Sequence, residues 1–278
     1  MAIRAYQPTT PGRRGMTTQD MEAITISKPV KSLITIKKGR TGRNNQGRIT
    51  TRHRGGGVKR YLRFINFNLP LGTIARVEHI EYDPGRSARI ARLKDQNSQY
   101  HYILAPKGLK QGAKIVVALE GPVEVGNRLP LQNIPVGTLL HAVELQPGRG
   151  AQLGRSAGTG VQLAAKDEAY AQLRLPSGEV RLAPIKGMAS VGAVGNEQHQ
   201  NVQLGKAGRK RHMGIRPTVR GIAMNAVDHP LGGGDGGAHG LGRNPKTPWG
   251  RPTLGFKTRR RKTNSTLIIK NRHQGKRR

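Results

Sequence analysis

The stretch YAQLRLPSGEVRLA (Tyr170–Ala183) decides the predicted fold class. Apolar and polar side chains alternate from Ala171 to Leu175, the period of two that a half-buried β-strand shows. The turn formers Pro, Ser and Gly follow at 176–178, and Val180 and Leu182 then resume the alternation. The sequence therefore predicts a β-hairpin here.

Short runs of the same character extend over residues 61–194. A first set comprises Tyr61–Phe67, Thr73–Tyr82, Ala88–Leu93, Tyr100–Leu104 and Lys114–Leu119. A second set comprises Thr138–Glu144, Gly160–Ala165, Tyr170–Leu175, Glu179–Ala183 and Met188–Val194. About five short, closely spaced strands in each set predict an all-β fold of two small barrels in tandem. We expect the boundary between them near Gly121–Pro135, and one short helix near Thr17–Ala23.

The charge is concentrated at the two ends of the chain. The whole sequence has 49 Lys and Arg against 15 Asp and Glu, a net charge of +34. Residues 1–60 contain 14 basic and 2 acidic side chains, and residues 201–278 contain 19 and 2. Such self-repulsion needs a polyanion to neutralise it. We therefore predict basic, mostly irregular extensions at 1–60 and 201–278, which flank barrels at 61–125 and 126–200.

The composition also excludes several classes of protein. The chain has no Cys, which excludes a disulfide scaffold and a thiolate-bound zinc site. No apolar run approaches the roughly 18 residues of a membrane span. The Gly- and Pro-rich extensions offer no good amphipathic helix for a lipid surface. We expect no membrane partner and no small-molecule substrate.

Two enzyme-like patterns occur, and neither has the expected context. Gly154–Gly158 reads G-x-S-x-G around Ser156, but the nucleophile elbow of a serine hydrolase needs a strand before it and a helix after it. Gly and Pro on both sides predict that neither element forms. Gly232–Gly237 reads G-x-G-x-x-G, but it follows Pro230-Leu231 rather than a strand. We expect both to be loops.

A metal site is also not expected. Asp228, His229, Asp235 and His239 are close in sequence, but their spacing matches no standard pair of ligands on a helix. We expect no cofactor, apart from Mg²⁺ that an RNA partner would bring.

The basic clusters themselves indicate RNA binding. RNNQGR (43–48) and RHRGGG (52–57) combine cations with amides and glycines, and KAGRKR (206–211) repeats this combination. Arg presents a planar fork to phosphate, Asn can reach base edges, and Gly admits tight backbone turns. Since only ten aromatic residues exist, we expect reading of phosphates and shape rather than stacking on a sheet. The alternative is a general nucleic-acid binder with tandem small barrels, whose basic extensions bind any polyanion.

A series of stretches, in order along nearly the whole chain, resembles one family. It includes GRNNQGRIT (42–50), RGGG (54–57), YDPGRSARIA (82–91), IPVGT (134–138), RLPSGE (174–179), VGAVGN (191–196), LGKAGR (204–209), RPTVRG (216–221), VDHP (227–230) and TPWG (247–250). Together they resemble the universal second protein of the large ribosomal subunit, of bacterial or organellar type.

The resemblance implies an OB-like barrel followed by an SH3-like barrel, with both extensions bound to 23S-type rRNA. It implies a structural protein rather than an enzyme, which contacts neighbouring ribosomal proteins and the small subunit, supports tRNA placement and helps shape the peptidyl transferase region. The expected location is the cytoplasmic ribosome, with an organellar ribosome as the alternative.

The resemblance also implies the site residues. His229 matches the loop histidine nearest the peptidyl transferase region, without a catalytic role. Leu231 and Ala226 depart from a second histidine and a proline that are common in the family. The candidate rRNA-binding residues are Arg43, Asn44, Asn45, Arg48, Arg52, Arg54, Lys59, Arg60, Arg86, Arg155, Lys206, Arg209, Lys210, Arg211, Arg216, Arg220, His229, Arg259, Arg260, Arg261 and Lys262.

Overall fold

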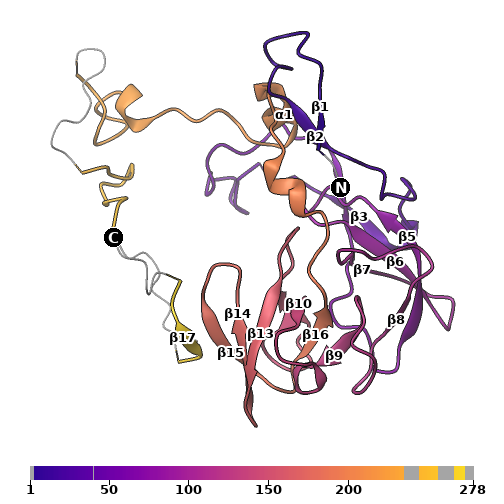
Figure 1. Ribbon diagram of the computed structural model, residues 1–278. Coiled ribbons are helices and arrows are strands. Elements are labelled where there is room, and N and C mark those ends of the chain that lie inside the picture. Colours follow the sequence, from indigo (N-terminus) through magenta and orange to yellow (C-terminus); the bar gives the residue numbers. More distant parts are fainter. Residues whose placement is uncertain (1–2, 40, 235–243, 256–265, 273–278) are drawn as a thin grey trace. The chain divides into compact units, whose positions relative to one another are not determined.

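The computed structural model describes residues 3–39, 41–234, 244–255 and 266–272 (Figure 1). Within them the chain is nearly all β, and its single α-helix is the short α1 (Ala207–His212). The 3₁₀ segments are η1 (Lys31–Leu33), η2 (Leu131–Asn133), η3 (Glu197–Asn201) and η4 (Gly221–Ala223). This secondary-structure content confirms the predicted all-β class.

The chain divides into two compact units. The first unit comprises residues 1–38, 59–209 and 264–278, and the second comprises 39–58 and 210–263. Both main sheets lie in the first unit, whereas the second unit combines parts of the two basic extensions. The four segments expected from the sequence, which end at residues 60, 125, 200 and 278, stay a prediction.

The first sheet is antiparallel, with the strand order β7-β6-β5-β8. Its strands are β5 (Ile74–Glu81), β6 (Ile90–Asp95), β7 (Tyr100–Leu104) and β8 (Lys114–Val116). Side chains alternate across it, because Ala75 and Val77 are buried whereas Arg76 between them is exposed. The apolar face, with Leu93 and Ile115, forms the core of this sheet.

The second sheet has the order β17-β15-β14-β13-β10-β16-β9. Its strands are β9 (Arg128–Pro130), β10 (Leu139–His141), β13 (Val161–Lys166), β14 (Tyr170–Arg174), β15 (Val180–Pro184), β16 (Met188–Val191) and β17 (Ile268–Lys270). The predicted hairpin is confirmed, since Arg174 pairs with Val180 and Tyr170 with Pro184. Its alternate residues Ala171 and Leu173 are buried in the core.

Short strand pairs complete the fold of the first unit. β1 (Ile3–Ala5) pairs with β2 (Thr17–Gln19), β3 (Ile34–Lys37) with β4 (Arg60–Arg63), and β11 (Val143–Glu144) with β12 (Ala151–Leu153). The prediction of a helix near Thr17–Ala23 is wrong, because Thr17–Gln19 forms the strand β2. Thr17 donates its backbone N–H to the carbonyl of Gln203 (3.0 Å), a partner far away along the chain.

The sequence does not predict several of the observed strands. β9 lies inside the expected boundary segment Gly121–Pro135, whereas β1, β2, β3, β12 and β17 lie outside both predicted sets. The predicted strand Thr138–Glu144 is interrupted at Ala142, whose φ is +48°. Local alternation does not reveal these pairings, because the partner is distant or the strand spans only a few residues.

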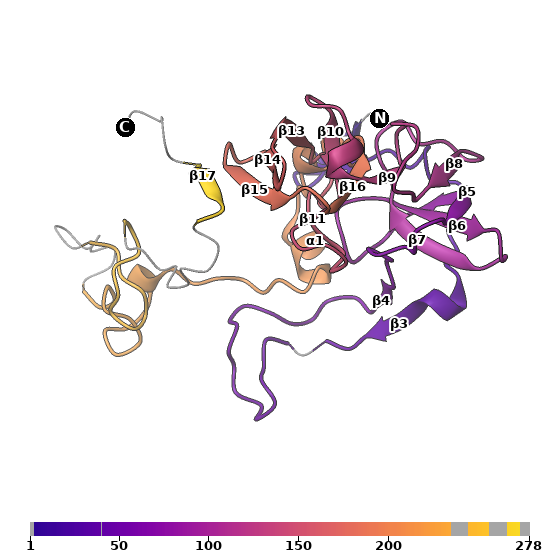
Figure 2. The ribbon, with the colours of Figure 1, turned by 90° about the horizontal axis from the view of Figure 1, so that it is seen from below.

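The two sheets of the first unit lie side by side (Figures 1 and 2). A third apolar cluster joins them, with Ala88 and Leu104 from the first half and Ala142, Ala151 and Val194 from the second. The isolated bridge from Val117 to Arg128 adds a backbone link between β8 and β9. The two barrel regions therefore share packing rather than forming independent bodies.

A buried ion pair joins β9, at one edge of the second sheet, to β11. Arg128 on β9 donates from Nη2 to Oε1 of Glu144 (2.7 Å), and from Nη1 to the carbonyl of Ala142 (2.9 Å). Oε2 of Glu144 accepts from the backbone N–H groups of Gly148 and Met188 (both 3.2 Å). Burial lowers the pKa of Arg128, while the charge of Glu144 opposes this shift. The paired charges are tolerated because both groups are hydrogen-bonded.

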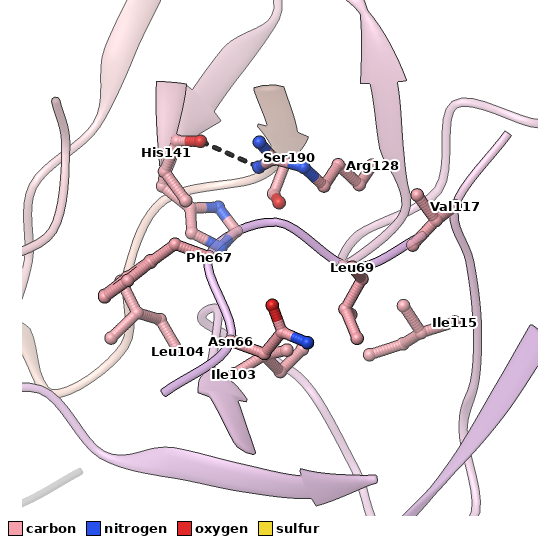
Figure 3. Close-up of a pocket in the computed structure, with 12 residues that line it drawn as sticks. Asn66, Phe67, Leu69, Ile103, Leu104, Ile115, Val117, Arg128, His141 and Ser190 are labelled. Atoms are coloured by element: carbon pink, nitrogen blue, oxygen red, sulfur yellow. Dashed lines mark hydrogen bonds between the residues drawn. The ribbon is translucent and has the colours of Figure 1, made fainter. Parts of the chain in front are cut away.

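His141 borders a cavity of about 30 Å³ between the two sheets, opposite Leu69 and Ile115 (Figure 3). Nδ1 of its ring donates to the carbonyl of Gly192 (2.8 Å), and the residue is 2% exposed. Burial lowers the pKa of His141 to about 4, against a smaller opposing effect of the Gly192 hydrogen bond. The imidazole is therefore neutral at pH 7.

We predict that the free energy of unfolding falls as the pH decreases from 6.5 to 4. The unfolded chain takes up a proton at His141 near pH 6.5, whereas the folded chain resists protonation down to about pH 4. The loss attributable to this group is up to about 3 kcal/mol. Urea unfolding at successive pH values should show a flatter profile for His141→Gln than for the parent chain. Equal slopes in this window would contradict the assignment.

Candidate nucleic-acid interface

The segment that contains RNNQGR forms a tightly bonded loop in the second unit. Arg43 and Ile49 form an antiparallel bridge, and Thr50 and Thr51 donate their backbone N–H groups to the carbonyl of Gly42 (2.9 and 3.0 Å). Gly42 has φ +75°, and an added Cβ would collide with the carbonyl of Thr51. Only glycine fits this close return of the chain.

The amide of Asn44 stabilises the same loop. Its Oδ1 accepts from the backbone N–H groups of Gln46 (3.0 Å) and Arg48 (2.9 Å). This oxygen therefore holds the turn, which leaves the Nδ2 group of Asn44 as its free donor. Asn45 and Arg48 are exposed beside it. The loop thus presents a fixed backbone with polar side chains around its tip.

The RHRGGG stretch pairs with residues from the other basic extension. Gly55 donates its N–H to the carbonyl of Gly214, and Val58 to that of His212 (both 2.9 Å). Arg54 forms an antiparallel bridge with Ile215. A Cβ on Gly57 would lie 2.9 Å from Cα of Gly214, so the two backbones touch without side chains between them.

This pairing creates an open cleft of about 400 Å³. Its lining includes Arg43, Arg52, Arg54, Arg211 and Arg216. Among the described residues that line it, none is Asp or Glu. Five guanidinium groups from two segments that are distant in the sequence therefore surround one space. Phosphate is the ligand that such groups bind best, because a guanidinium can donate two parallel hydrogen bonds to it.

Arg86 and Arg155 meet at a second place, in the first unit. The guanidinium of Arg155 lies 4.0 Å from the ring centre of Phe67, and that of Arg86 lies 5.8 Å from it. Arg86 also donates from Nε to Oδ2 of the buried Asp83 (2.7 Å). Burial lowers the pKa of Arg155, and the nearby charge of Arg86 lowers it further. The two cations are thus held together with one carboxylate.

The KAGRKR stretch contributes both structural and exposed cations. Arg209 donates from Nη1 to the backbone carbonyl of Thr17 (3.0 Å), which ties this stretch to β2. The short helix α1, which includes Arg209, Lys210 and Arg211, buries none of its residues. Lys206 and Lys210 are exposed. The cluster therefore has two roles, since Arg209 stabilises the fold while Lys206 and Lys210 expose their charges to solvent.

His229 lies inside its own loop. The residue is 7% exposed, and Nδ1 of its ring accepts from the backbone N–H of Leu231 (3.1 Å). A Cβ on Gly221 would collide with the ring, so the imidazole packs directly on that backbone. The carbonyl of His229 accepts from the N–H of Gly232 (2.8 Å). These contacts make His229 a residue that positions the glycine-rich loop.

The other candidate rRNA-binding residues make few described contacts or lie outside the described residues. Lys59 and Arg220 are exposed, and Arg60 donates to the carbonyl of Pro84 (3.4 Å). Arg259, Arg260, Arg261 and Lys262 lie outside the described residues. The structure therefore brings together the arginines of two sequence clusters in the second unit, whereas Arg86 and Arg155 belong to the first unit.

The enzyme-like patterns stay without their context. A strand does precede Ser156, since β12 ends at Leu153, so the expectation that none would form is wrong. Ala151 on β12 is buried in the cluster between the sheets, which explains the strand. A turn near Ser156 and then β13 follow, rather than the helix that a nucleophile elbow requires. The other motif, Gly232–Gly237, runs beyond the described residues from Asp235 onward.

The described residues show neither a metal site nor a membrane-spanning helix. Within the described parts of the chain, no three His, Cys, Asp or Glu side chains are grouped closely enough to hold a metal ion. Asp235 and His239 fall outside those parts. No helix in the same parts has the length and apolar composition to cross a membrane.

Sequence reasoning misses one residue of the second unit. Trp249 is 78% exposed, and the guanidinium of Arg52 lies 5.4 Å from its ring centre. The signal that could have found it is the occurrence of the only Trp of the chain within a basic segment rich in Gly and Pro.

Two family models match the chain. The model described as Ribosomal Proteins L2, RNA binding N-terminal domain, matches residues 30–117. The model described as Ribosomal Proteins L2, C-terminal domain, matches residues 124–250. The matched ranges include both sheets' main strands and the arginine cleft. The chain therefore belongs to the ribosomal protein L2 family.

Proposed function

We propose that this chain binds and organises the 23S-type rRNA of the large ribosomal subunit through the arginine cleft. Membership of the family makes it an RNA-binding structural constituent of that subunit, which acts in translation. The observation that carries the more specific proposal is the cleft between Arg43, Arg52, Arg54, Arg211 and Arg216.

The charge of the second unit supports this proposal. Its sequence contains 17 Lys and Arg but only two acids, Asp228 and Asp235. The described ion pairs all lie in the first unit, such as those of Glu144 with Arg128 and of Glu197 with Lys107. The cations of the second unit must therefore obtain their counter-charge from a ligand, and rRNA supplies one at each phosphate.

The proposal extends to the neighbourhood of the cleft. The chain contacts adjacent ribosomal proteins and the small subunit, supports subunit association and tRNA placement, and helps shape the peptidyl transferase region. The catalytic centre is rRNA, and His229 positions its loop instead of transferring protons. Its buried ring and its hydrogen bond from Leu231 support that role.

No cofactor of its own is needed for this function, and Mg²⁺ arrives with the rRNA. We place this ribosome in the cytoplasm as part of the same proposal. Co-fractionation of the tagged chain with an organelle would contradict the location and leave the rRNA site unaffected.

Substitution of cleft arginines should lower the salt dependence of rRNA binding. Arg54→Gln and Arg216→Gln each remove one phosphate contact, so the slope of log affinity against log salt should become shallower by roughly 0.7–0.9 for each. Filter binding of the full chain to transcribed large-subunit rRNA, over a range of salt concentrations, measures this slope.

Arg76→Gln is the matched control for that experiment. Arg76 is also exposed, but it lies on β5 in a depression that includes the acids Glu78 and Asp95. Its replacement should leave the slope unchanged. If all three variants changed the slope equally, binding would depend on total charge, and the general polyanion binder would replace the present proposal.

His229→Ala should permit assembly and lower peptide transfer by less than about tenfold, because it removes packing and one hydrogen bond worth about 1 kcal/mol. His229→Asn should retain more activity, since its Oδ1 can accept from Leu231. Peptide transfer by purified subunits that contain each variant is the measurement. A loss of about 10²–10⁴ for both variants is expected of a general acid–base, and would instead establish a catalytic imidazole.

A further inference from the structure

Trp249 is an exposed aromatic residue in the second unit, which contains 17 Lys and Arg but only two acids. The residue is 78% exposed, more than any other Phe, Tyr or Trp among the described residues. A ring of this size in water is unfavourable unless a partner covers it, because Trp has one of the largest apolar areas of any side chain. The exposure therefore indicates a contact that this chain alone does not make.

The backbone that presents Trp249 is fixed. Lys246 and Pro252 form an antiparallel bridge, and Thr247 donates its N–H to the carbonyl of Arg251 (2.7 Å). Gly250 donates in turn to the carbonyl of Thr247 (2.9 Å), which closes a turn around the tryptophan. Because the turn is bonded on both sides, Trp249 is presented at the tip of a small hairpin rather than on a loose strand.

One face of the ring is already occupied by a cation. The guanidinium of Arg52 lies 5.4 Å from the ring centre, within the range of a cation–π interaction. Since the residue remains 78% exposed with Arg52 in place, the opposite face is open. Arg52 also lines the arginine cleft, so the ring is adjacent to the space expected to hold phosphates.

We propose that Trp249 stacks an unpaired RNA base on its open face while the phosphates next to that base bind the arginine cleft. The order is then Arg52, indole and base, in which the cation and the base lie on opposite faces of one ring. This inference rests on the proposed function and specifies the ligand as single-stranded RNA. A duplex would hide its bases from the indole.

The chemistry favours RNA over a protein partner. An apolar protein surface would have to bury Arg52, and also Lys246 and Arg251 on the same hairpin, without a described acid from this unit apart from Asp228 to balance them. A nucleotide brings a π-face and an anion together, and so satisfies the indole and the guanidinium groups at once. Every base has such a face, so the platform tolerates different sequences.

Trp249 is the only tryptophan of the chain, so its fluorescence reports directly on this site. The full chain should be titrated with single-stranded oligoadenylate of about 12 nucleotides, and with an abasic RNA of the same length and charge. We expect strong quenching by the first and little by the second, because only the first can stack. RNA duplex should resemble the abasic RNA.

Variants supply the second readout, the affinity measured by fluorescence anisotropy of labelled RNA. Trp249→Ala should weaken binding of oligoadenylate by roughly tenfold and leave that of abasic RNA unchanged, whereas Trp249→Phe should recover much of the loss. Tyr170→Ala is the matched control, since Tyr170 is 40% exposed on β14 but follows the acids Asp167 and Glu168. It should have no effect.

The outcomes separate this inference from the proposed function. Equal quenching by abasic RNA, or an unchanged affinity of Trp249→Ala for oligoadenylate, would overturn the stacking inference, and salt-dependent rRNA binding would persist. If the parent chain failed to bind large-subunit rRNA at all, the proposed function would fail and the stacking inference with it.

Discussion

The structure depends on where the few carboxylates lie. Asp and Glu number 15 against 49 Lys and Arg. In the first unit six acids form the described ion pairs, of which Arg128–Glu144 and Arg86–Asp83 are partly or fully buried. The second unit has 17 cations and two acids. The first unit therefore balances part of its charge internally, with 13 acids against 32 Lys and Arg, whereas the second unit has almost no internal counter-charge and needs an anion to balance it.

The backbone of the second unit meets this constraint without adding side-chain bulk. Gly55 and Gly57 allow the chain to approach Gly214 so closely that main-chain hydrogen bonds join two segments that both carry positive charge. These bonds oppose the repulsion between Arg54 and its neighbours across the cleft, Arg211 and Arg216. A phosphate bound in the cleft, as we propose, would relieve the repulsion that remains. The geometry that costs stability in the free chain would then favour binding.

The sequence is most informative where structure is local. The hairpin around Pro176–Gly178 and the strand Tyr100–Leu104 are predicted correctly because alternation and turn residues are adjacent in sequence. β9 and β17 are missed because each depends on a distant partner, β16 or β15. Both halves of the arginine cleft are predicted as RNA-binding clusters. That these two clusters lie together could not be predicted, because they meet through glycine backbones, and such contacts leave no pattern of side chains in the sequence.

We propose that the basic segments bind a defined site in rRNA and not any polyanion. Sedimentation of the tagged chain from cell extract through a sucrose gradient, after a high-salt wash, tests it most directly. Non-specific charge binding fails at high salt, so we expect stoichiometric retention in the large-subunit peak. Release of the chain to the top of the gradient would contradict the claim.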